Sequence, residues 1–600
     1  MTPRKFLSAA AGCLLLSLTA AHGATPFEAE CAKLAGRKGN DSERLHALFK
    51  LEWEKRMHDS PEFATGVGFP GQNDRWTDVS LEAIAQRRRE LGAPLQVIRS
   101  IDRSSLSATD QLSYDLFLQN FEDAVEGARF NEEYLALTQL SGVQQSAAAV
   151  LEQAPRATVK DYEDQIARLK ALPKLVEQTM VLLSKGLEAG ITPPRITLRD
   201  VPQQVQNQMV PENNSLLKSF REFPATIPEP DRARLQVEAG GVLKEQIIPA
   251  FGKLHEFLAT KYLPGARESI AAADLPDGKA WYEFAVRTST TTRKTPAQIH
   301  ELGLAEVKRI RAEMDKVIHQ TGFQGSFADF CKFLRTDPKF YYTDAESLLT
   351  AYRDICKRVD PELPRLFGKL PRLSYGVKAV PSYAEKSQTT AYYEGGSPEA
   401  GRPGWYFANT YALNTRPKWE MEALSLHESV PGHHLQIALA QELEATPEFR
   451  KHGGYTAFVE GWGLYAESLG PEMGFYKDPY AHFGQLTYEM WRAVRLVVDT
   501  GMHSMGWTRQ QAIDYFMANS SKNEHDITVE IDRYIAWPGQ ALAYKIGELK
   551  IKELRAYATR ELKARFDIRQ FHDQVLGVGA VPMDILEARI KAWVAEKKRT

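Results

Sequence analysis

Cysteine is scarce in this chain, and no pair of cysteines has the spacing of a common zinc motif. Four cysteines occur in 600 residues, and Cys-x-x-Cys is absent. Zinc held by thiolates is therefore not expected. In an exported protein, Cys331 and Cys356 could form a disulfide, which would leave Cys31 over.

Long apolar segments and an excess of one charge are also lacking. Beyond the N-terminal residues, no segment approaches the roughly 18 apolar residues of a membrane-spanning helix. The 75 Lys and Arg residues nearly balance 77 Asp and Glu residues, the formal net charge is -2, and no basic stripe is present. We therefore expect no stable membrane insertion and no nucleic-acid partner.

The first 24 residues have the pattern of a secretory signal peptide. A basic start at Arg4 is followed by an apolar run and then by small residues, which predicts cleavage near Gly23 or Ala24. Cys13 follows Ala-Ala-Gly, as in a lipoprotein signal, but cleavage there would leave too short an apolar core before it. We expect an exported protein, either periplasmic or secreted.

Helical periodicity dominates the rest of the chain. Residues 27 to 270 repeatedly place apolar side chains three and four positions apart, and Thr158 before Val-Lys-Asp has the pattern of a helix start. Thr295-Pro296 opens a further helix. Residues 281 to 288 alternate like a short strand, and residues 373 to 413 have the composition of a small sheet. These patterns predict a helical scaffold lobe over 25–275 and a catalytic lobe over 276–600.

The residues with the clearest chemistry lie between positions 420 and 436. His427 and Glu428 are adjacent, and His433 and His434 follow closely. Histidines that hold a metal beside a carboxylate that takes a proton from water are what a zinc hydrolase needs. The usual spacing of two such histidines is four residues, whereas here it is six or seven.

A break in the helix would reconcile this spacing with one metal ion. In a straight helix His433 would lie about 9 Å along the axis from His427, too far to share one ion. Pro431 and Gly432 stand between them and favour such a break. Two residues could then bulge out and bring His433 close to His427. The alternative is an ordinary helix end with surface histidines.

A third candidate ligand follows downstream. Glu460 begins an otherwise apolar and aromatic segment that continues to Glu467. A carboxylate in such surroundings is costly unless it is paired or bound to a cation. Glu460 is therefore a predicted zinc ligand, and a structural salt bridge is the alternative.

Three segments carry a resemblance to a known family. They are His-Glu-x-x-Pro-Gly-His-His-Leu-Gln, Val-Glu-Gly-Trp-Gly-Leu-Tyr-Ala-Glu and Arg-Leu-Val-Val-Asp-Thr-Gly-Met-His. Together they resemble the bacterial family called domain of unknown function 885. That family in turn resembles the glutamate-zincin peptidases of the thimet oligopeptidase, neurolysin and carboxypeptidase Taq group. The resemblance covers residues 280 to 600 well and the N-terminal half loosely.

The resemblance implies both a site and a fold. His427, His433 and Glu460 would be the zinc ligands and Glu428 the general base. The two-residue insertion leaves His434 as an alternative ligand, and Glu467 is predicted to support or replace a ligand. The implied fold is mainly α, a large two-lobed helical body around a deep cleft, with a small antiparallel sheet beside the metal helix, as in neurolysin.

The same resemblance implies residues that contact the substrate. A tyrosine-rich segment would supply a donor to the tetrahedral intermediate, with Tyr544 as the best match and Tyr534 in reserve. An exposed strand at residues 405 to 411 would bind an extended peptide, which assigns substrate contacts to Tyr406 and Asn409.

Two arginines and an aspartate share one face of a predicted helix. Arg492, Arg495 and Asp499 stand three and four residues apart between Tyr480 and His503. A buried ion network that supports the metal helix is the favoured interpretation. The alternative is that an arginine binds the terminal carboxylate of a peptide.

These observations predict zinc-dependent hydrolysis of peptide bonds in short peptides. Glu428 would take a proton from the attacking water and return it to the leaving amine. Two alternatives stay open. The protein could hydrolyse a non-peptide amide or ester with the same residues, or it could bind peptides without cleaving them.

Overall fold

The computed structural model describes residues 23–382, 385 and 388–599. The predicted signal peptide lies outside these residues except for its last two positions. The described chain is mainly helical, with one small three-stranded sheet, as the sequence predicted. Among the described residues, no helix is both long enough and apolar enough to cross a membrane.

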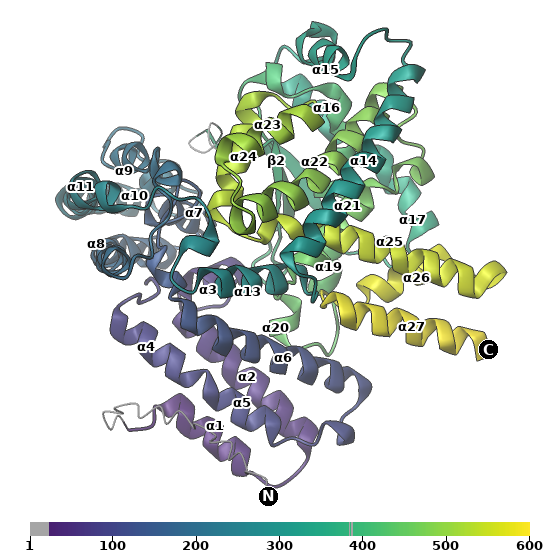
Figure 1. The fold of residues 1–600 in the computed structure, drawn as a ribbon. Helices are drawn as coiled ribbons and strands as arrows, with labels where there is room; N and C mark the ends of the chain where they lie inside the picture. Colours follow the sequence, from purple (N-terminus) through teal and green to yellow (C-terminus); the bar gives the residue numbers. More distant parts are fainter. Residues whose placement is uncertain (1–22, 383–384, 386–387, 600) are drawn as a thin grey trace, which may run out of the picture.

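Six helices form the lower part of the molecule in Figure 1. They are α1 (Pro26–Gly36), α2 (Asp41–Asp59), α3 (Pro61–Val67), α4 (Leu81–Glu90), α5 (Gly92–Arg99) and α6 (Ala108–Gly127). Their buried apolar residues join those of residues 307 to 594 in one continuous core. The first helices of the chain are therefore packed onto the part that holds the metal-binding candidates.

The next six helices enclose a core of their own, on the left in Figure 1. They are α7 (Val143–Gln153), α8 (Val159–Ala189), α9 (Val201–Gln208), α10 (Glu229–Val242), α11 (Ile248–Phe257) and α12 (Leu263–Gly265). Thr158 begins α8 with a capping box, in which its side chain accepts from the Asp161 backbone and the Asp161 side chain accepts from the Thr158 backbone. The helix start predicted at Thr158 is confirmed.

Five helices precede the sheet. They are α13 (Gly278–Thr290), α14 (Pro296–Gln320), α15 (Phe327–Thr336), α16 (Ala345–Val359) and α17 (Leu363–Leu366). The strand predicted at residues 281 to 288 is wrong, because these residues belong to α13. Tyr282, Val286 and Thr290 are buried at intervals of four, which is the spacing of one helix face. The predicted helix start at Thr295 is confirmed by a capping box.

The sheet lies where the composition predicted it, but its topology differs. Its strands are β1 (Tyr375–Ala379), β2 (Ala391–Glu394) and β3 (Gly404–Ala408), in the order β1-β3-β2. β3 runs parallel to β1 and antiparallel to β2. The sheet is therefore mixed, and the prediction of an antiparallel sheet is wrong. β3 is its central strand and β2 is an edge strand.

Ten helices complete the chain. They are α18 (Met421–Glu428), α19 (His433–Gln441), α20 (Glu448–Lys451), α21 (Thr456–Glu467), α22 (Pro479–Ser504), α23 (Arg509–Asn519), α24 (Glu524–Ala536), α25 (Ala543–Leu562), α26 (Ile568–Leu576) and α27 (Met583–Arg599). α22 is buried along most of its length and runs beside α14 (Figure 1). α21 crosses α25 at two glycines, where a Cβ on Gly461 would lie 2.5 Å from the Gly547 Cα. The two backbones are in direct contact there.

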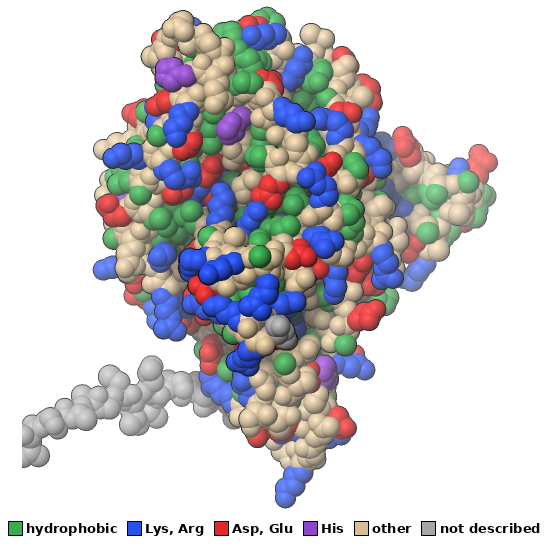
Figure 2. Space-filling model, turned by 90° about the vertical axis from the view of Figure 1, so that its right-hand side faces the viewer, with side chains coloured by type: hydrophobic (Ala, Val, Ile, Leu, Met, Phe, Trp, Pro, Cys, Tyr) green, Lys and Arg blue, Asp and Glu red, His purple; other side chains and the backbone are tan. Residues whose placement is uncertain are grey.

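One face of the surface carries charges of both signs (Figure 2), and the described cysteines are free thiols. On the face seen in Figure 2, where α25 and α27 end, Lys and Arg side chains lie among Asp and Glu side chains. Cys31, Cys331 and Cys356 are each buried with a free thiol, so Cys331 and Cys356 do not form a disulfide.

Candidate metal centre

The helix whose last two residues are His427 and Glu428 ends where the sequence predicted a break. α18 stops at Glu428, and α19 starts at His433 after a four-residue turn that contains a cis bond before Pro431. A side chain on Gly432 would overlap the carbonyl oxygen of His427, so the close turn requires glycine at this position.

The turn brings three predicted ligands together. Glu460 Oε2 lies 3.5 Å from His427 Nε2 and 3.4 Å from His433 Nε2. Donor atoms that bind one tetrahedral zinc at about 2.1 Å lie about 3.4 Å from one another, so the group fits the ion. Two imidazoles and a carboxylate are also a donor set that zinc accepts. No other group of this kind occurs among the described residues.

A second glutamate fixes the orientation of His427. The Nδ1–H group of His427 donates to Glu467 Oε1 at 2.8 Å, which leaves Nε2 directed at the group. Burial alone would lower the pKa of His427, but hydrogen bonds to Glu460 and Glu467 raise it to about 9. The carboxylates of Glu460 and Glu467 therefore stabilise a positive charge on the His427 ring.

Glu460 is held in its ionised form by the same neighbours. Burial would raise its pKa, yet the charges and hydrogen bonds of His433 and His427 hold the pKa well below its ordinary value. An ionised carboxylate is the state that binds a divalent metal, and a bound metal would replace the proton that each histidine shares with Glu460. Glu467 contacts His427 and is not a member of the group formed by His427, His433 and Glu460. Its role in supporting a zinc ligand stays a prediction.

His434 is directed elsewhere. Its Nδ1 accepts from the Tyr393 hydroxyl at 2.8 Å, and its Nε2 donates to the Leu373 carbonyl at 3.0 Å. Burial lowers the pKa of His434 to about 4, so it remains neutral and links α19 to the sheet. The prediction of His434 as an alternative ligand is therefore wrong, and His433 is the histidine that lies beside His427 and Glu460.

The three residues open onto a cavity of about 320 Å³ that Glu428 and Tyr544 also line. Both residues were predicted to act in catalysis. The structure brings them to the same cavity as His427, His433 and Glu460, which we call the metal group. Burial, followed by the charge of Glu460, raises the pKa of Tyr544, so its hydroxyl keeps its proton. A neutral phenol beside the group can donate a hydrogen bond.

Other parts of the cavity wall come from the sheet and from two helices. Ala391, Tyr392 and Tyr393 belong to β2. α22 and α24 supply further aromatic and charged residues, which are Tyr488, Trp491, Arg492, Arg495, Glu530 and Arg533, and Trp537 directly after α24 also lines the cavity.

The predicted ion network on α22 is present in part. Arg495 Nη2 lies 3.2 Å from Glu530 Oε2. Asp499 does not pair with either arginine of α22, because it accepts from the Tyr282 hydroxyl at 2.6 Å and from the Gly539 backbone. Glu530 and Arg533 were not predicted as site residues, although their spacing of three residues on α24 is a signal for an ion pair.

A family model decides the relationship of this chain to known proteins. The family described as bacterial protein of unknown function (DUF885) matches residues 61–590. The chain belongs to the DUF885 family. The family membership expected from the motifs is thereby confirmed. A comparison with curated proteins gave no match.

Two solved structures are similar to this DUF885 protein. A predicted lipoprotein from Colwellia psychrerythraea has a TM-score of 0.87 and 28% sequence identity, and the match covers 93% of this chain and 100% of that chain. A predicted lipoprotein of unknown function from Shewanella oneidensis has a TM-score of 0.68 and 16% identity, covering 92% and 99%. The second likeness shows a shared fold alone.

Three residues predicted to bind substrate lie in the interior of the DUF885 fold and do not line the cavity. Tyr406 is fully buried on the central strand, with its ring 5.3 Å from that of Tyr352. The Asn409 amide donates to three backbone carbonyls before β2. The Tyr534 hydroxyl accepts from Trp491 and Arg495, each at 2.8 Å. These substrate assignments are therefore wrong.

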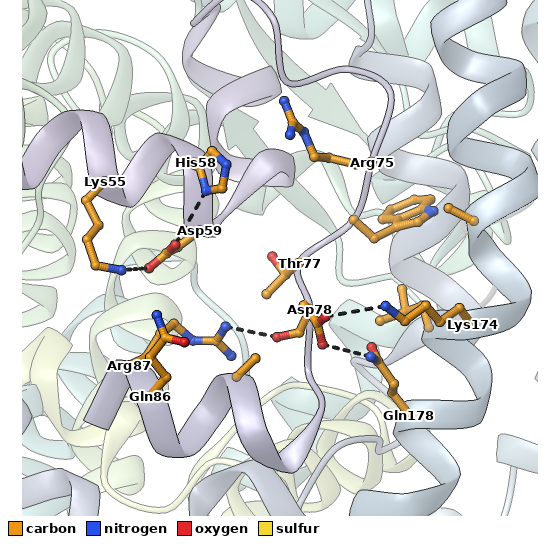
Figure 3. Close-up of a pocket in the computed structure, with 14 residues that line it drawn as sticks. Lys55, His58, Asp59, Arg75, Thr77, Asp78, Gln86, Arg87, Lys174 and Gln178 are labelled. Atoms are coloured by element: carbon orange, nitrogen blue, oxygen red, sulfur yellow. Dashed lines mark hydrogen bonds and ion pairs between the residues drawn. The ribbon is translucent and has the colours of Figure 1, made fainter. Parts of the chain in front are cut away.

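A second hollow of the DUF885 protein, of about 380 Å³, lies between α2, α4 and α8 (Figure 3). Several of its charged side chains are paired with one another. Asp78 contacts Lys174 and Gln178, and Lys55 contacts Asp59. None of the described residues that line this hollow belongs to a group that could hold a metal ion.

Proposed function

We propose that this protein is a zinc-dependent hydrolase that cleaves peptide bonds in short peptides. The observation that carries the proposal is the convergence of His427, His433 and Glu460 at a cavity that Glu428 and Tyr544 also line. His427, His433 and Glu460 would hold the zinc. When bound, zinc supplies a Lewis acid that polarises a carbonyl group and makes water more acidic.

The residues around the group have separate roles in this proposal. Glu428 accepts a proton from the attacking water and returns it to the leaving amine. Tyr544 donates its hydroxyl to the oxygen that becomes negative as the carbonyl is attacked. Glu467 keeps the His427 ring in one orientation through the 2.8 Å hydrogen bond to Nδ1.

The sheet supplies a surface for an extended peptide, on a strand other than the one predicted. β3 is paired on both sides, so its backbone has no free edge for a peptide. β2 is an edge strand, and three of its residues line the cavity. A peptide that pairs with the edge of β2 would lie beside the metal group. The role predicted for residues 405 to 411 is therefore assigned to β2.

We further propose that the protein is related to the glutamate zincins and has a two-lobed body with its active site in a cleft. The separate core of residues 137 to 266 and the helical majority support this relationship. Two similar structures are predicted lipoproteins, which supports export of this chain to the periplasm or the medium. Cys13, where the sequence argues against a lipoprotein signal, lies outside the described residues.

The first experiment is to measure metal content by mass spectrometry in the mature protein and in Glu460→Ala. We expect about one zinc per chain in the wild type and loss of zinc in the variant. Two metal-free preparations after incubation with zinc would contradict the proposal.

A substrate panel then separates the classes of function. We expect the wild type to cleave short peptides, and Glu428→Gln to keep zinc while losing at least about 100-fold in rate. Hydrolysis of small amides or esters alone would favour a non-peptide hydrolase. Peptide binding without cleavage, even with added zinc, would favour a binding protein.

A further inference from the structure

Three buried arginines, Arg492, Arg495 and Arg533, line the cavity that holds the metal group. Two of them share a protein carboxylate. Arg533 Nη2 and Arg495 Nη2 lie 3.1 Å and 3.2 Å from the same oxygen of Glu530. The carboxylate of Glu530 thus pairs with two guanidinium groups, and Arg492 is not among its partners.

Arg492 has few partners of its own. A guanidinium carries five N–H groups. Arg492 donates to the Tyr488 carbonyl at 3.3 Å, and its Nε has no hydrogen-bond partner among the described residues. Its nearest carboxylate is Glu467, 3.6 Å from Nη2, which already accepts from His427. The side chain is only 6% exposed, so an added anion would stabilise it.

The position of Arg492 relates it directly to the metal group. Glu467 Oε1 contacts both Arg492 and His427, so an anion on Arg492 would lie close to the predicted ligands. The cavity of about 320 Å³ is at the small end of ligand sites, which suits the end of a chain better than its middle.

We infer that Arg492 binds the free carboxylate at the C terminus of a peptide, so that the protein removes residues from that end. The inference rests on the proposed hydrolytic function and names its substrate class. The planar guanidinium can donate two parallel hydrogen bonds to a carboxylate. Because an extended chain advances about 3.5 Å per residue, the bond beside the metal group would be within the last one or two residues.

An acidic side chain offers the same chemistry as a terminal carboxylate, so the test must separate these sources. Binding is measured by calorimetry on Glu428→Gln, which keeps the cavity and slows turnover. Three probes are compared: an N-acetylated apolar tripeptide as the free acid, the same peptide as the C-terminal amide, and an amide peptide that carries one glutamate. Each is repeated with Arg492→Gln, with Arg492→Lys, and with Arg353→Gln on the exposed face of α16 as the matched control.

We expect the free acid to bind at least about 30-fold more tightly than the amide, and the glutamate peptide to bind like the amide. Arg492→Gln should reduce the affinity for the acid to that for the amide, Arg492→Lys should restore part of it, and Arg353→Gln should change neither. Equal binding of acid and amide, preference for the glutamate peptide, unchanged preference in Arg492→Gln, or no binding of any probe would overturn the inference.

The same experiment distinguishes this inference from the proposed function. An acid preference that Arg492→Gln abolishes, in a protein that cleaves no peptide, would leave the carboxylate site intact and reject the hydrolase. Cleavage of acid and amide peptides with equal kcat/KM would keep the hydrolase and reject the carboxylate site. Circular dichroism of each variant verifies that the fold is unchanged.

Discussion

The ring of His427 lies against Gly463, so closely that a Cβ on residue 463 would be 2.7 Å from Cε1 of the ring. Real side chains do not approach to this distance, so Gly463→Ala must displace the imidazole. We expect the substitution to weaken zinc binding by about 10–100-fold, as for other changes that disturb the orientation of a ligand. Competition with a chelator measures the affinity.

A matched control for this variant is available on the loop before α21. Gly454 has Val459 Cγ2 at 3.7 Å as the nearest atom to an added Cβ, which is ordinary contact. Gly454→Ala should therefore bind zinc like the wild type. Equal zinc affinity in Gly463→Ala and Gly454→Ala would show that the ring position does not control the metal.

The adjacent histidines provide a second prediction. His433→Gln removes a member of the metal group and should abolish zinc binding. His434→Gln removes hydrogen bonds to Tyr393 and Leu373 and should lower the unfolding temperature while keeping about one zinc per chain. Mass spectrometry and thermal unfolding measure the two effects. Loss of zinc in His434→Gln alone would contradict the assignment.

A buried lysine supports the helix that carries Tyr544. Lys545 Nζ lies 2.6 Å from Glu548, 2.8 Å from Glu489 and 3.0 Å from Glu306, and the side chain is fully buried. Lys545→Met leaves these carboxylates without their shared cation, so we expect a loss of about 3–5 kcal/mol in the free energy of unfolding. Urea unfolding measures it. Lys550→Met, on a more exposed pair of the same helix, should cost about 1 kcal/mol or less.

His572 predicts how stability depends on pH. Nδ1 donates to the Leu366 carbonyl and Nε2 accepts from the Tyr465 hydroxyl, and burial lowers the pKa of His572 from 6.5 to about 3. Because the folded-state pKa is depressed, this contribution to stability is fully present above about pH 6.5 and is lost as the pH falls toward about 3. His572→Gln does not titrate, so its unfolding temperature should fall less steeply over this range.

The control for the pH experiment is an exposed histidine. His525→Gln, on the surface of α24, should keep the slope of the wild type. If His572→Gln also follows the wild-type slope, other buried groups control the acid limb of the stability curve.

Local sequence was sufficient for features whose causes are local. Capping residues at Thr158 and Thr295 gave the correct helix starts, and Pro431-Gly432 gave the correct helix break. The strand predicted at residues 281 to 288 failed because a short aromatic segment fits either period until its buried face is known.

Features that depend on contacts between distant parts of the chain could not be predicted from the local sequence. The choice of His433 over His434 depends on Tyr393, which reaches α19 from the sheet. The central place of β3 depends on pairing with β1 and β2, and no residue of β3 encodes it alone. Glu530 acquires its place in the cavity wall only when α24 packs beside α22.

The crossing of α21 and α25 affects how activity can be recognised in related proteins. Glu460 precedes Gly461 on one helix, and Tyr544 comes one turn before Gly547 on the other. The distance between a proposed ligand and a proposed oxyanion donor is thus set by two residues that have no side chain. A relative that keeps every reactive group but has a larger residue at either glycine would have its donor too far from the substrate, so an inventory of reactive side chains alone would misclassify it as active.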